Sequence, residues 1–154
     1  MNREIVLIKH FKGAPGLRFF GIGPYLLPCK GLYKLKALLD KNTSWAKNRK
    51  LKDLKHCLAN SDAIVSLWSN NKILGFGRAL SDGIYRSVLW DIVIDNQHQG
   101  KGYGKLIVKS LLESKKINQS EKVYLMTSTQ KNFYCQIGFK EVLSQNLLIK
   151  NIKN

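Results

Sequence analysis

The spacing of apolar residues predicts a chain in which strands and helices alternate. Residues 5–11 are apolar and β-branched, as in an early strand. Residues 31–41 carry leucines at helical spacing, and a second helix is expected to begin near Ser44, a good N-cap. Four apolar residues would then share one face of that second helix: Trp45, Leu51, Leu54 and Leu58.

From residue 63 the apolar period shortens and predicts a sheet. Three strands separated by turns are expected at residues 63–68, 73–80 and 85–95. Further elements follow at 102–114 (helix), 123–126 (strand), 130–137 (helix) and 141–149 (one or two closing strands). Hairpins combined with a β-α-β-α run predict an α+β fold with a mixed sheet and helices on both faces.

Length and composition indicate one domain over residues 1–154. Neither an internal repeat nor a linker rich in Pro, Gly or Ser divides the chain. The three cysteines lie far apart without a C-x-x-C pair, which argues against a disulfide framework or a zinc site. No metal is therefore expected, and the sequence does not specify an oligomeric state.

The strongest compositional feature is positive charge. Lys and Arg number 26 against 10 Asp and Glu, so the net charge is +16. Such a surface attracts nucleic acid, an anionic membrane or a phosphate-bearing cofactor. A basic nucleic-acid-binding module is therefore an alternative function, although no zinc pattern, RNP-like aromatic motif or clear helix-turn-helix accompanies the charge. The Lys-rich residues 30–56 are interpreted as a solvated helix face.

The sequence offers no sign of membrane insertion or export. No segment is long and apolar enough to span a bilayer, so no membrane partner is expected. Residues 1–8 look like a strand rather than a signal or transit peptide. We therefore expect the protein to stay where it is made, in a bacterial cytoplasm or in an organelle that encodes it.

The most informative segment is a glycine loop, Gln99-Gly100-Lys101-Gly102-Tyr103-Gly104, which joins the strand at 85–95 to the helix at 102–114. Glycines let backbone N–H groups turn toward a ligand, and the helix N-terminus adds partial positive charge. Together they form a site for phosphate oxygens, which Lys101 and Lys105 would strengthen.

Two common phosphate loops do not fit this segment. The P-loop pattern G-x-x-x-x-G-K-[ST] fails because Leu106 follows Lys105 and Gln99 occupies the first glycine position. The dinucleotide pattern G-x-G-x-x-G fails because the glycines here are spaced more tightly and follow hairpin strands. A tight turn that binds nothing is the remaining alternative, although three glycines at a helix start would weaken that helix.

The glycine loop resembles the Q/R-x-x-G-x-G/A motif of the GNAT acetyltransferases, and it stands where that family carries it, between the fourth strand and the third helix. The resemblance implies the GNAT fold, with a mixed sheet of about six to seven strands, and acetyl-CoA as co-substrate. Loop amides would bind the pyrophosphate, and the preceding strand would pair with the pantetheine arm. The cofactor-binding residues would be Ile92, Val93, Ile94, Gln99, Gly100, Lys101, Gly102, Tyr103, Gly104 and Lys105.

A second motif supports the same family. Residues 133–139, Phe-Tyr-Cys-Gln-Ile-Gly-Phe, are similar to its F-Y-x-x-x-G-F signature. The resemblance makes Tyr134 the general acid that protonates the CoA thiolate as it leaves, while Phe133 and Phe139 are expected to pack in the core. Thr127 departs from the family, which often has Asn or Asp seven residues before this tyrosine. A GNAT fold that binds CoA without catalysis is therefore a further alternative.

Residues 75–83 and 89–94 are similar to GNAT enzymes of cyanobacteria and plastids, including plastid-encoded acetyltransferases of red algae. The resemblance implies transfer of an acetyl group from acetyl-CoA to a primary amine by direct attack. The acceptors associated with these relatives are protein amines, at an N-terminus or on Lys, and arylalkylamines such as serotonin. It also favours the plastid (chloroplast) stroma as the location.

Asp91 is the candidate side chain near the attacking amine, because a base or a water chain must take a proton from the ammonium. By strand alternation it should share a face with Leu89 and Val93. A carboxylate in an apolar strand needs a partner, so a structural hydrogen bond to a loop is the other interpretation. A strand amide near Ile92 or Val93 is a candidate for polarising the thioester carbonyl.

Overall fold

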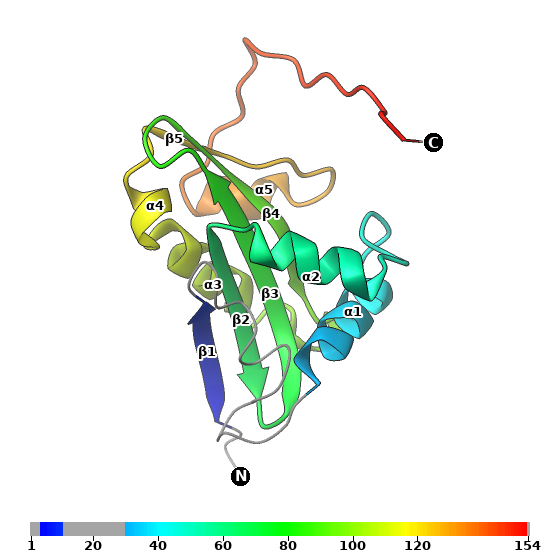
Figure 1. The fold of residues 1–154 in the computed structure, drawn as a ribbon. Helices are drawn as coiled ribbons and strands as arrows, with labels where there is room; N and C mark the ends of the chain where they lie inside the picture. The colour runs from blue at the N-terminus through cyan, green and yellow to red at the C-terminus, as the bar shows by residue number, and fades with distance from the viewer. Residues whose placement is uncertain (1–3, 11–29, 154) are drawn as a thin grey trace.

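A five-stranded sheet organises the chain, which a computed structural model describes over residues 4–10 and 30–153 (Figure 1). The strands lie in sequence order, antiparallel from β1 to β4, and β5 runs parallel to β4. The irregular connection expected at residues 12–28 lies outside the described residues. The strand bounds are β1 (Ile5–His10), β2 (Ala63–Ser69), β3 (Lys72–Ser81), β4 (Arg86–Ile94) and β5 (Lys122–Tyr124).

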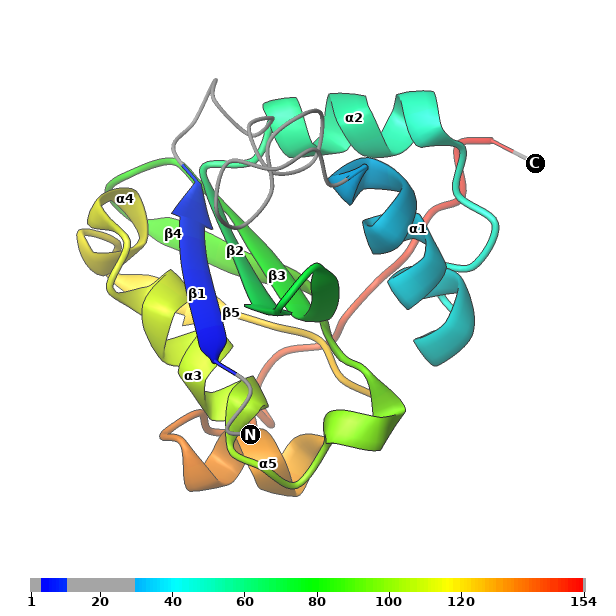
Figure 2. The ribbon, with the colours of Figure 1, turned by 90° about the horizontal axis from the view of Figure 1, so that it is seen from below.

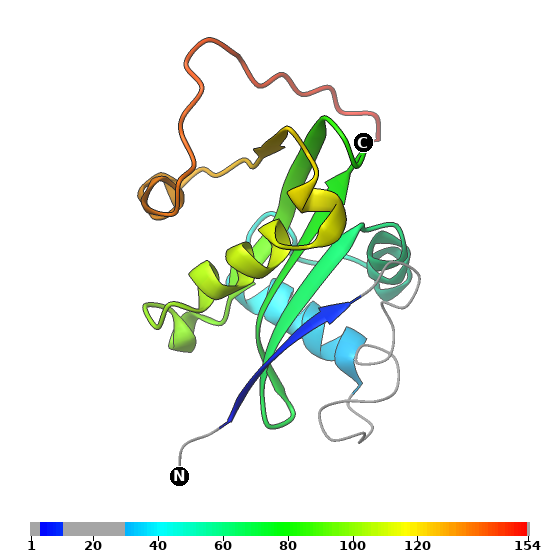
Figure 3. The ribbon, with the colours of Figure 1, turned by 90° about the vertical axis from the view of Figure 1, so that its left-hand side faces the viewer.

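Helices cover both faces of the sheet (Figures 1 and 3). One face carries α1 (Gly31–Asn42) and α2 (Leu51–Ala59), and the other carries α3 (Tyr103–Leu112) and α4 (Lys115–Asn118). A short 3-10 helix, η3 (Asn96–His98), precedes α3, and α5 (Lys131–Gln136) follows β5. The predicted mixed α+β sheet with helices on both faces is confirmed. Among the described helices, none combines the length and hydrophobicity needed to cross a bilayer.

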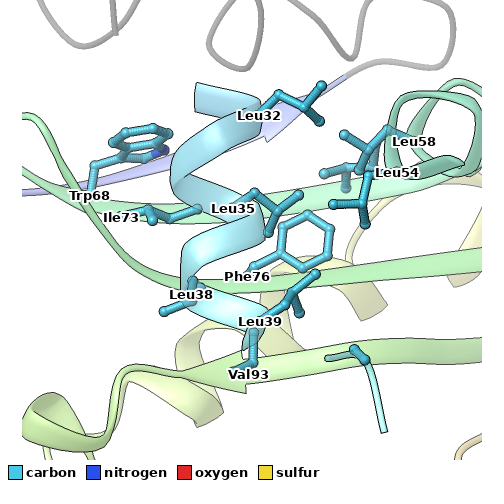
Figure 4. Close-up of a cluster of buried hydrophobic side chains, with 12 residues drawn as sticks. Leu32, Leu35, Leu38, Leu39, Leu54, Leu58, Trp68, Ile73, Phe76 and Val93 are labelled. Atoms are coloured by element: carbon cyan, nitrogen blue, oxygen red, sulfur yellow. The ribbon is translucent and has the colours of Figure 1, made fainter. Parts of the chain in front are cut away.

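The inner strand β2 contributes to both cores. All of its residues are buried, as expected for a strand covered on both faces. Trp68 packs with the α1 side, whereas Leu67 packs with the α3 side. On the α1 side, Leu35 and Leu39 lie against Phe76 of β3 (Figure 4). The sheet is therefore held between two apolar layers that share its strands.

The second helix begins at Leu51 rather than near Ser44, so that prediction was wrong. Residues 43–50 form a connection in which local polar groups replace helical bonds: the Asp40 carboxylate accepts the Asn48 N–H, and Asn48 has a left-handed backbone (φ 66°). Trp45 is consequently exposed and does not share the apolar face of α2.

The closing strands expected within 141–149 are not formed, which leaves five strands instead of six to seven. The segment 140–153 runs clear of the sheet (Figures 1 and 3), and Leu143 and Leu148 are each 87% exposed. Alternating apolar residues favour a strand, but a strand also needs a neighbour to pair with. Whether another strand lies alongside depends on the tertiary structure, which the local sequence pattern does not specify.

A β-bulge interrupts β4. From Phe76 to Arg78 strand β3 advances two residues, while their partners on β4, Val93 and Trp90, are three residues apart. Two residues of β4 therefore lie opposite Gly77. The first of them, Asp91, has a left-handed backbone with φ 53°. An extra residue of this kind bends a strand and reverses its alternation.

The bulge changes which side chains share a face of β4. Leu89 packs with the α3-side cluster, as does Ile92, whereas Val93 packs on the α1 side. The prediction that Asp91 shares a face with both Leu89 and Val93 was therefore wrong for Leu89. Strand alternation holds only while the register is continuous.

Helix α3 packs directly onto the backbone of β3 opposite the bulge. A Cβ at Gly77 would lie 2.8 Å from Ile107 Cγ2 and 3.0 Å from Leu111 Cδ1. We expect Gly77→Ala to lower the free energy of unfolding by about 1–3 kcal/mol in urea denaturation, because overpacking displaces α3. In an Ile107→Ala background, which lacks Cγ2, the same change should cost less. An equal cost in both backgrounds would contradict the close packing.

Candidate functional site

The glycine loop follows η3 and runs into the first turn of α3. Gly100 (φ 75°) and Gly102 (φ 79°) both have left-handed backbones, and a Cβ added at either would meet no atom within 4 Å. Glycine is therefore needed here for backbone conformation rather than for close packing. The space in front of both residues is open.

The backbone N–H groups of the glycine loop are potential donors to a ligand. From Gln99 to Lys105, none donates a hydrogen bond to another described residue. The first helical bond of α3 runs from the Leu106 N–H to the Gly102 carbonyl (3.1 Å). Unpaired N–H groups at a helix N-terminus carry partial positive charge and bind phosphate oxygens. The loop thus has donors available for an anion.

Asp95 fixes the start of the loop, and sequence reasoning did not single it out. Its buried carboxylate accepts the Gln97 N–H (3.0 Å) and lies 3.3 Å from Lys72 Nζ. Burial alone would raise the pKa of Asp95, but the Gln97 N–H, His98 and Lys72 outweigh it and hold the pKa below its usual value. The sequence does contain a local signal for this role: an Asp that directly follows a strand, in a position to accept the N–H two residues later.

Helix α5 lies near the start of α3 (Figure 2), and its Phe133 contacts Gly104. A Cβ at Gly104, in the first turn of α3, would lie 3.1 Å from the Phe133 ring. The rings of Phe133 and Tyr134 meet edge-on with centroids 4.9 Å apart. Burial raises the pKa of the Tyr134 phenol, so this group is protonated at neutral pH. The two sequence motifs are therefore joined by one packing contact.

Strands β4 and β5 diverge halfway along β4. They are paired from Arg86–Lys122 to Val88–Tyr124, and beyond Val88 no described residue of β4 pairs with β5. The main chain of residues 89–94, which includes Ile92, Val93 and Ile94, is consequently open on that side. Unpaired strand groups of this kind accept an extended ligand or peptide.

A cavity of about 1030 Å³ adjoins this divergence. Trp90 of β4, Val123 of β5 and Tyr134 of α5 contribute to its walls, which residues 140–147 also border. The glycine loop is not part of the lining and lies beyond the N-terminal end of α3. Thr127 also lines the cavity, and its hydroxyl accepts the Gln130 N–H (3.0 Å) just before α5. This residue therefore stabilises the turn that leads into α5.

Asp91 has two partners that the sequence did not reveal. Arg49, just before α2, donates to both carboxylate oxygens (2.8 and 3.1 Å), and Arg78 of β3 donates through Nε (2.7 Å). Burial alone would raise the pKa of Asp91, but Arg49 and Arg78 outweigh it and hold the pKa below its usual value. The carboxylate is thus ionised with both oxygens engaged. Within the described residues, no group of three or more His, Cys, Asp or Glu is placed to hold a metal ion.

Comparison with protein families matches residues 56–141 to the acetyltransferase (GNAT) domain. The chain is 35% identical over 113 residues to the N-acetyltransferase ycf52 of Pyropia yezoensis, covering 70% of this chain and 64% of that protein. It is 28% identical over 130 residues to GCN5-related N-acetyltransferase 2, chloroplastic, of Arabidopsis thaliana, covering 71% and 50%. The chain therefore spans less than two thirds of the length of these relatives.

A solved structure shares the fold. An acetyltransferase of the GNAT family from Xanthomonas campestris superposes with a TM-score of 0.72 at 19% identity, covering 97% of this chain and 94% of that chain. At such low identity the likeness concerns the fold alone. The resemblance predicted from the two motifs, including relatives in red algae and cyanobacteria, is confirmed.

The role of Asp95 can be tested through its charge. Asp95→Asn should lower the free energy of unfolding by about 1–2 kcal/mol at pH 7, because Lys72 loses its ionised partner. Folding lowers the pKa of Asp95, so its contribution is present above the unfolded-state pKa of about 3.9 and is lost as the pH falls through the folded-state value. Wild type and variant should therefore converge in urea denaturation at acidic pH.

The exposed Asp53 of α2 provides the control, since Asp53→Asn removes a carboxylate of the same kind from the surface. Its effect on stability should stay small at every pH. A difference between wild type and Asp95→Asn that persists undiminished in acid would contradict the role given to the ionised carboxylate.

Proposed function

Because this chain belongs to the GNAT acetyltransferase family, we propose that it transfers the acetyl group of acetyl-CoA to a primary amine. The observation that carries the proposal is the set of N–H groups from Gln99 to Lys105, at the N-terminus of α3, which have no hydrogen-bond acceptor among the described residues. Such a loop suits the pyrophosphate of CoA, and the side chains of Lys101 and Lys105 add positive charge beside it.

The divergence of β4 from β5 supports a binding site for the pantetheine arm of the cofactor beside β4. The main chain of Ile92, Val93 and Ile94 has no strand partner on that side, so its polar groups can pair with the amide-containing pantetheine arm. When bound, the cofactor supplies an activated acetyl thioester. An N–H of Ile92 or Val93 would then polarise the carbonyl in the manner of an oxyanion hole.

Tyr134 is proposed as the general acid. Its raised pKa keeps the phenol protonated at neutral pH, which a general acid requires. Two observations support the role: Tyr134 lines the cavity, and its ring contacts Phe133, which packs on Gly104. The attacking amine loses its proton to a base or a water chain. Asp91 is poorly suited as that base, since both of its oxygens accept guanidinium hydrogens and its pKa is low.

The acceptor that we propose is an amine of a protein, at an N-terminus or on Lys, or an arylalkylamine such as serotonin. The net charge of +16 favours an acceptor that carries negative charge near its amine. We propose the plastid stroma as the location, since the Arabidopsis relative is described as chloroplastic.

The loop assignment predicts a difference between two matched glycines. Gly102 (φ 79°) and Gly83 (φ 82°) both have left-handed backbones with no atom within 4 Å of an added Cβ, but Gly83 lies in the β3–β4 turn. Replacing either by Ala should cost about 1–2 kcal/mol of stability. Only Gly102→Ala should weaken the binding of CoA, by about tenfold or more in calorimetry, because it distorts the N–H donors. Unchanged affinity would contradict the loop assignment.

The role of Tyr134 as general acid predicts that removal of its hydroxyl lowers turnover without lowering the affinity for the cofactor. Tyr134→Phe should lower kcat on the order of 100-fold, measured by thiol release from acetyl-CoA, while the affinity for CoA changes little. Wild-type activity should also fall at alkaline pH as the phenol ionises, and the variant should lack that decline. Tyr85→Phe, at an exposed tyrosine, is the control and should behave like wild type. Equal activity of Tyr134→Phe and wild type would remove Tyr134 from the mechanism.

A further inference from the structure

The backbone of Asp91 is in an unfavourable conformation for a residue with a side chain. Left-handed angles cost a non-glycine residue about 1–2 kcal/mol, although Asp tolerates them better than most. At a bulge whose first residue is left-handed, that residue is usually Gly. Here it is an Asp whose side chain is only 4% exposed. Its carboxylate must therefore offset both the backbone strain and the burial of a charge.

The compensation comes from two other parts of the chain. Arg49 reaches Asp91 from the connection that precedes α2, and Arg78 reaches it from the neighbouring strand β3. The three side chains are 32%, 12% and 4% exposed for Arg49, Arg78 and Asp91. Hydrogen bonds between ionised groups are strong at this degree of burial when every charge has its partner. Removal of one partner leaves the other charge buried and uncompensated.

The opposite face of the sheet fixes the same point. Gly77 lies across from the bulge, and Ile107 and Leu111 of α3 press against it so closely that a Cβ there would lie 2.8 Å from Ile107 Cγ2. The bulge is therefore enclosed between α3 on one side and the two guanidinium groups on the other.

We propose that Arg49 and Arg78 are positioning residues for acetyl transfer. Through Asp91 they hold the bulge formed by Asp91 and Ile92, and the bulge sets the direction of the N–H groups of Ile92 and of Val93, the next residue. This inference rests on the proposed function, in which one of these N–H groups polarises the thioester carbonyl. Donors of that kind are effective only when they are held in place before the reaction begins.

The proposal separates turnover from cofactor affinity. The glycine loop has its own support in Asp95, so its geometry does not depend on the Arg49–Asp91–Arg78 cluster. Loss of the cluster should therefore misdirect the carbonyl donor while the pyrophosphate site stays intact. A misplaced donor of this kind lowers kcat by up to about 100-fold or more.

The test uses four variants of the full chain. Asp91→Asn keeps the shape and the tolerance of left-handed angles but removes the charge, and Asp91→Gly keeps the backbone preference without a carboxylate. Arg49→Met removes one guanidinium, and Arg49→Lys retains a charge but not the fork of two bonds. Arg86→Met is the control, because Arg86 is also on β4 but pairs with Glu121 at the surface.

Thiol release from acetyl-CoA, with serotonin or a Lys-containing peptide as acceptor, should show kcat at least about tenfold lower for Asp91→Asn, Asp91→Gly and Arg49→Met. Arg49→Lys should recover part of the rate, and Arg86→Met should equal wild type. The affinity of all variants for CoA, measured by calorimetry, should stay within about twofold. The double variant Arg49→Met/Asp91→Asn should be no slower than the slower single variant, because the two residues act as a unit.

Amide hydrogen exchange gives a readout that needs no acceptor. The N–H groups that join β3 to β4 on either side of the bulge should exchange at least about tenfold faster in Asp91→Asn than in wild type, while those in α3 are unchanged. All measurements are made at a temperature at which circular dichroism shows each variant folded. If Arg49→Met does not fold, Arg49→Lys provides the comparison.

Unchanged kcat and unchanged exchange in the folded variants would overturn the proposal. A parallel fall of kcat and CoA affinity would also overturn it, because that result indicates general loss of the site. These outcomes differ from failure of the proposed function, in which the wild-type protein itself would bind no CoA.

Discussion

The shape of β4 depends on an ionised carboxylate held inside the protein by two guanidinium groups. Asp91 sits where the strand is bent, and its partners come from β3 and from the connection before α2. A charge in this environment is tolerated only with such partners. The cluster thus couples the bend of one strand to the placement of a helix that is distant in sequence. Beyond Val88 the strand also diverges from β5, which leaves residues 89–94 without a partner on that side among the described residues.

The two halves of the site are supported by different kinds of interaction. The glycine loop is built locally, from left-handed glycines and from Asp95, which caps the turn that precedes it. The bend of β4 is built from long-range contacts on both faces of the sheet. The proposed anion site and the proposed polarising amide therefore rest on different interactions, although only a few residues of sequence lie between them.

This division explains how much could be predicted from the sequence. The helix after the glycine loop, the strand β2 and the loop itself follow from local periodicity and backbone preference, and the structure bears them out. The bulge could not be predicted, because register depends on what packs against the strand. Arg49 lies 42 residues from Asp91, and no local pattern joins them. The segment 141–149 shows that a local pattern alone can also mislead. Its residues alternate as in a strand, but they pair with no described strand.

The contact of Gly104 with the ring of Phe133 constrains how such a chain can diverge over time. A methyl group at position 104 would lie 3.1 Å from the Phe133 ring, so Ala is accommodated there only if that ring shifts by a few tenths of an ångström. The ring also supports Tyr134 edge-on, so a change at position 104 would be felt by the tyrosine. Two stretches separated by about thirty residues of sequence are thus coupled through one van der Waals contact.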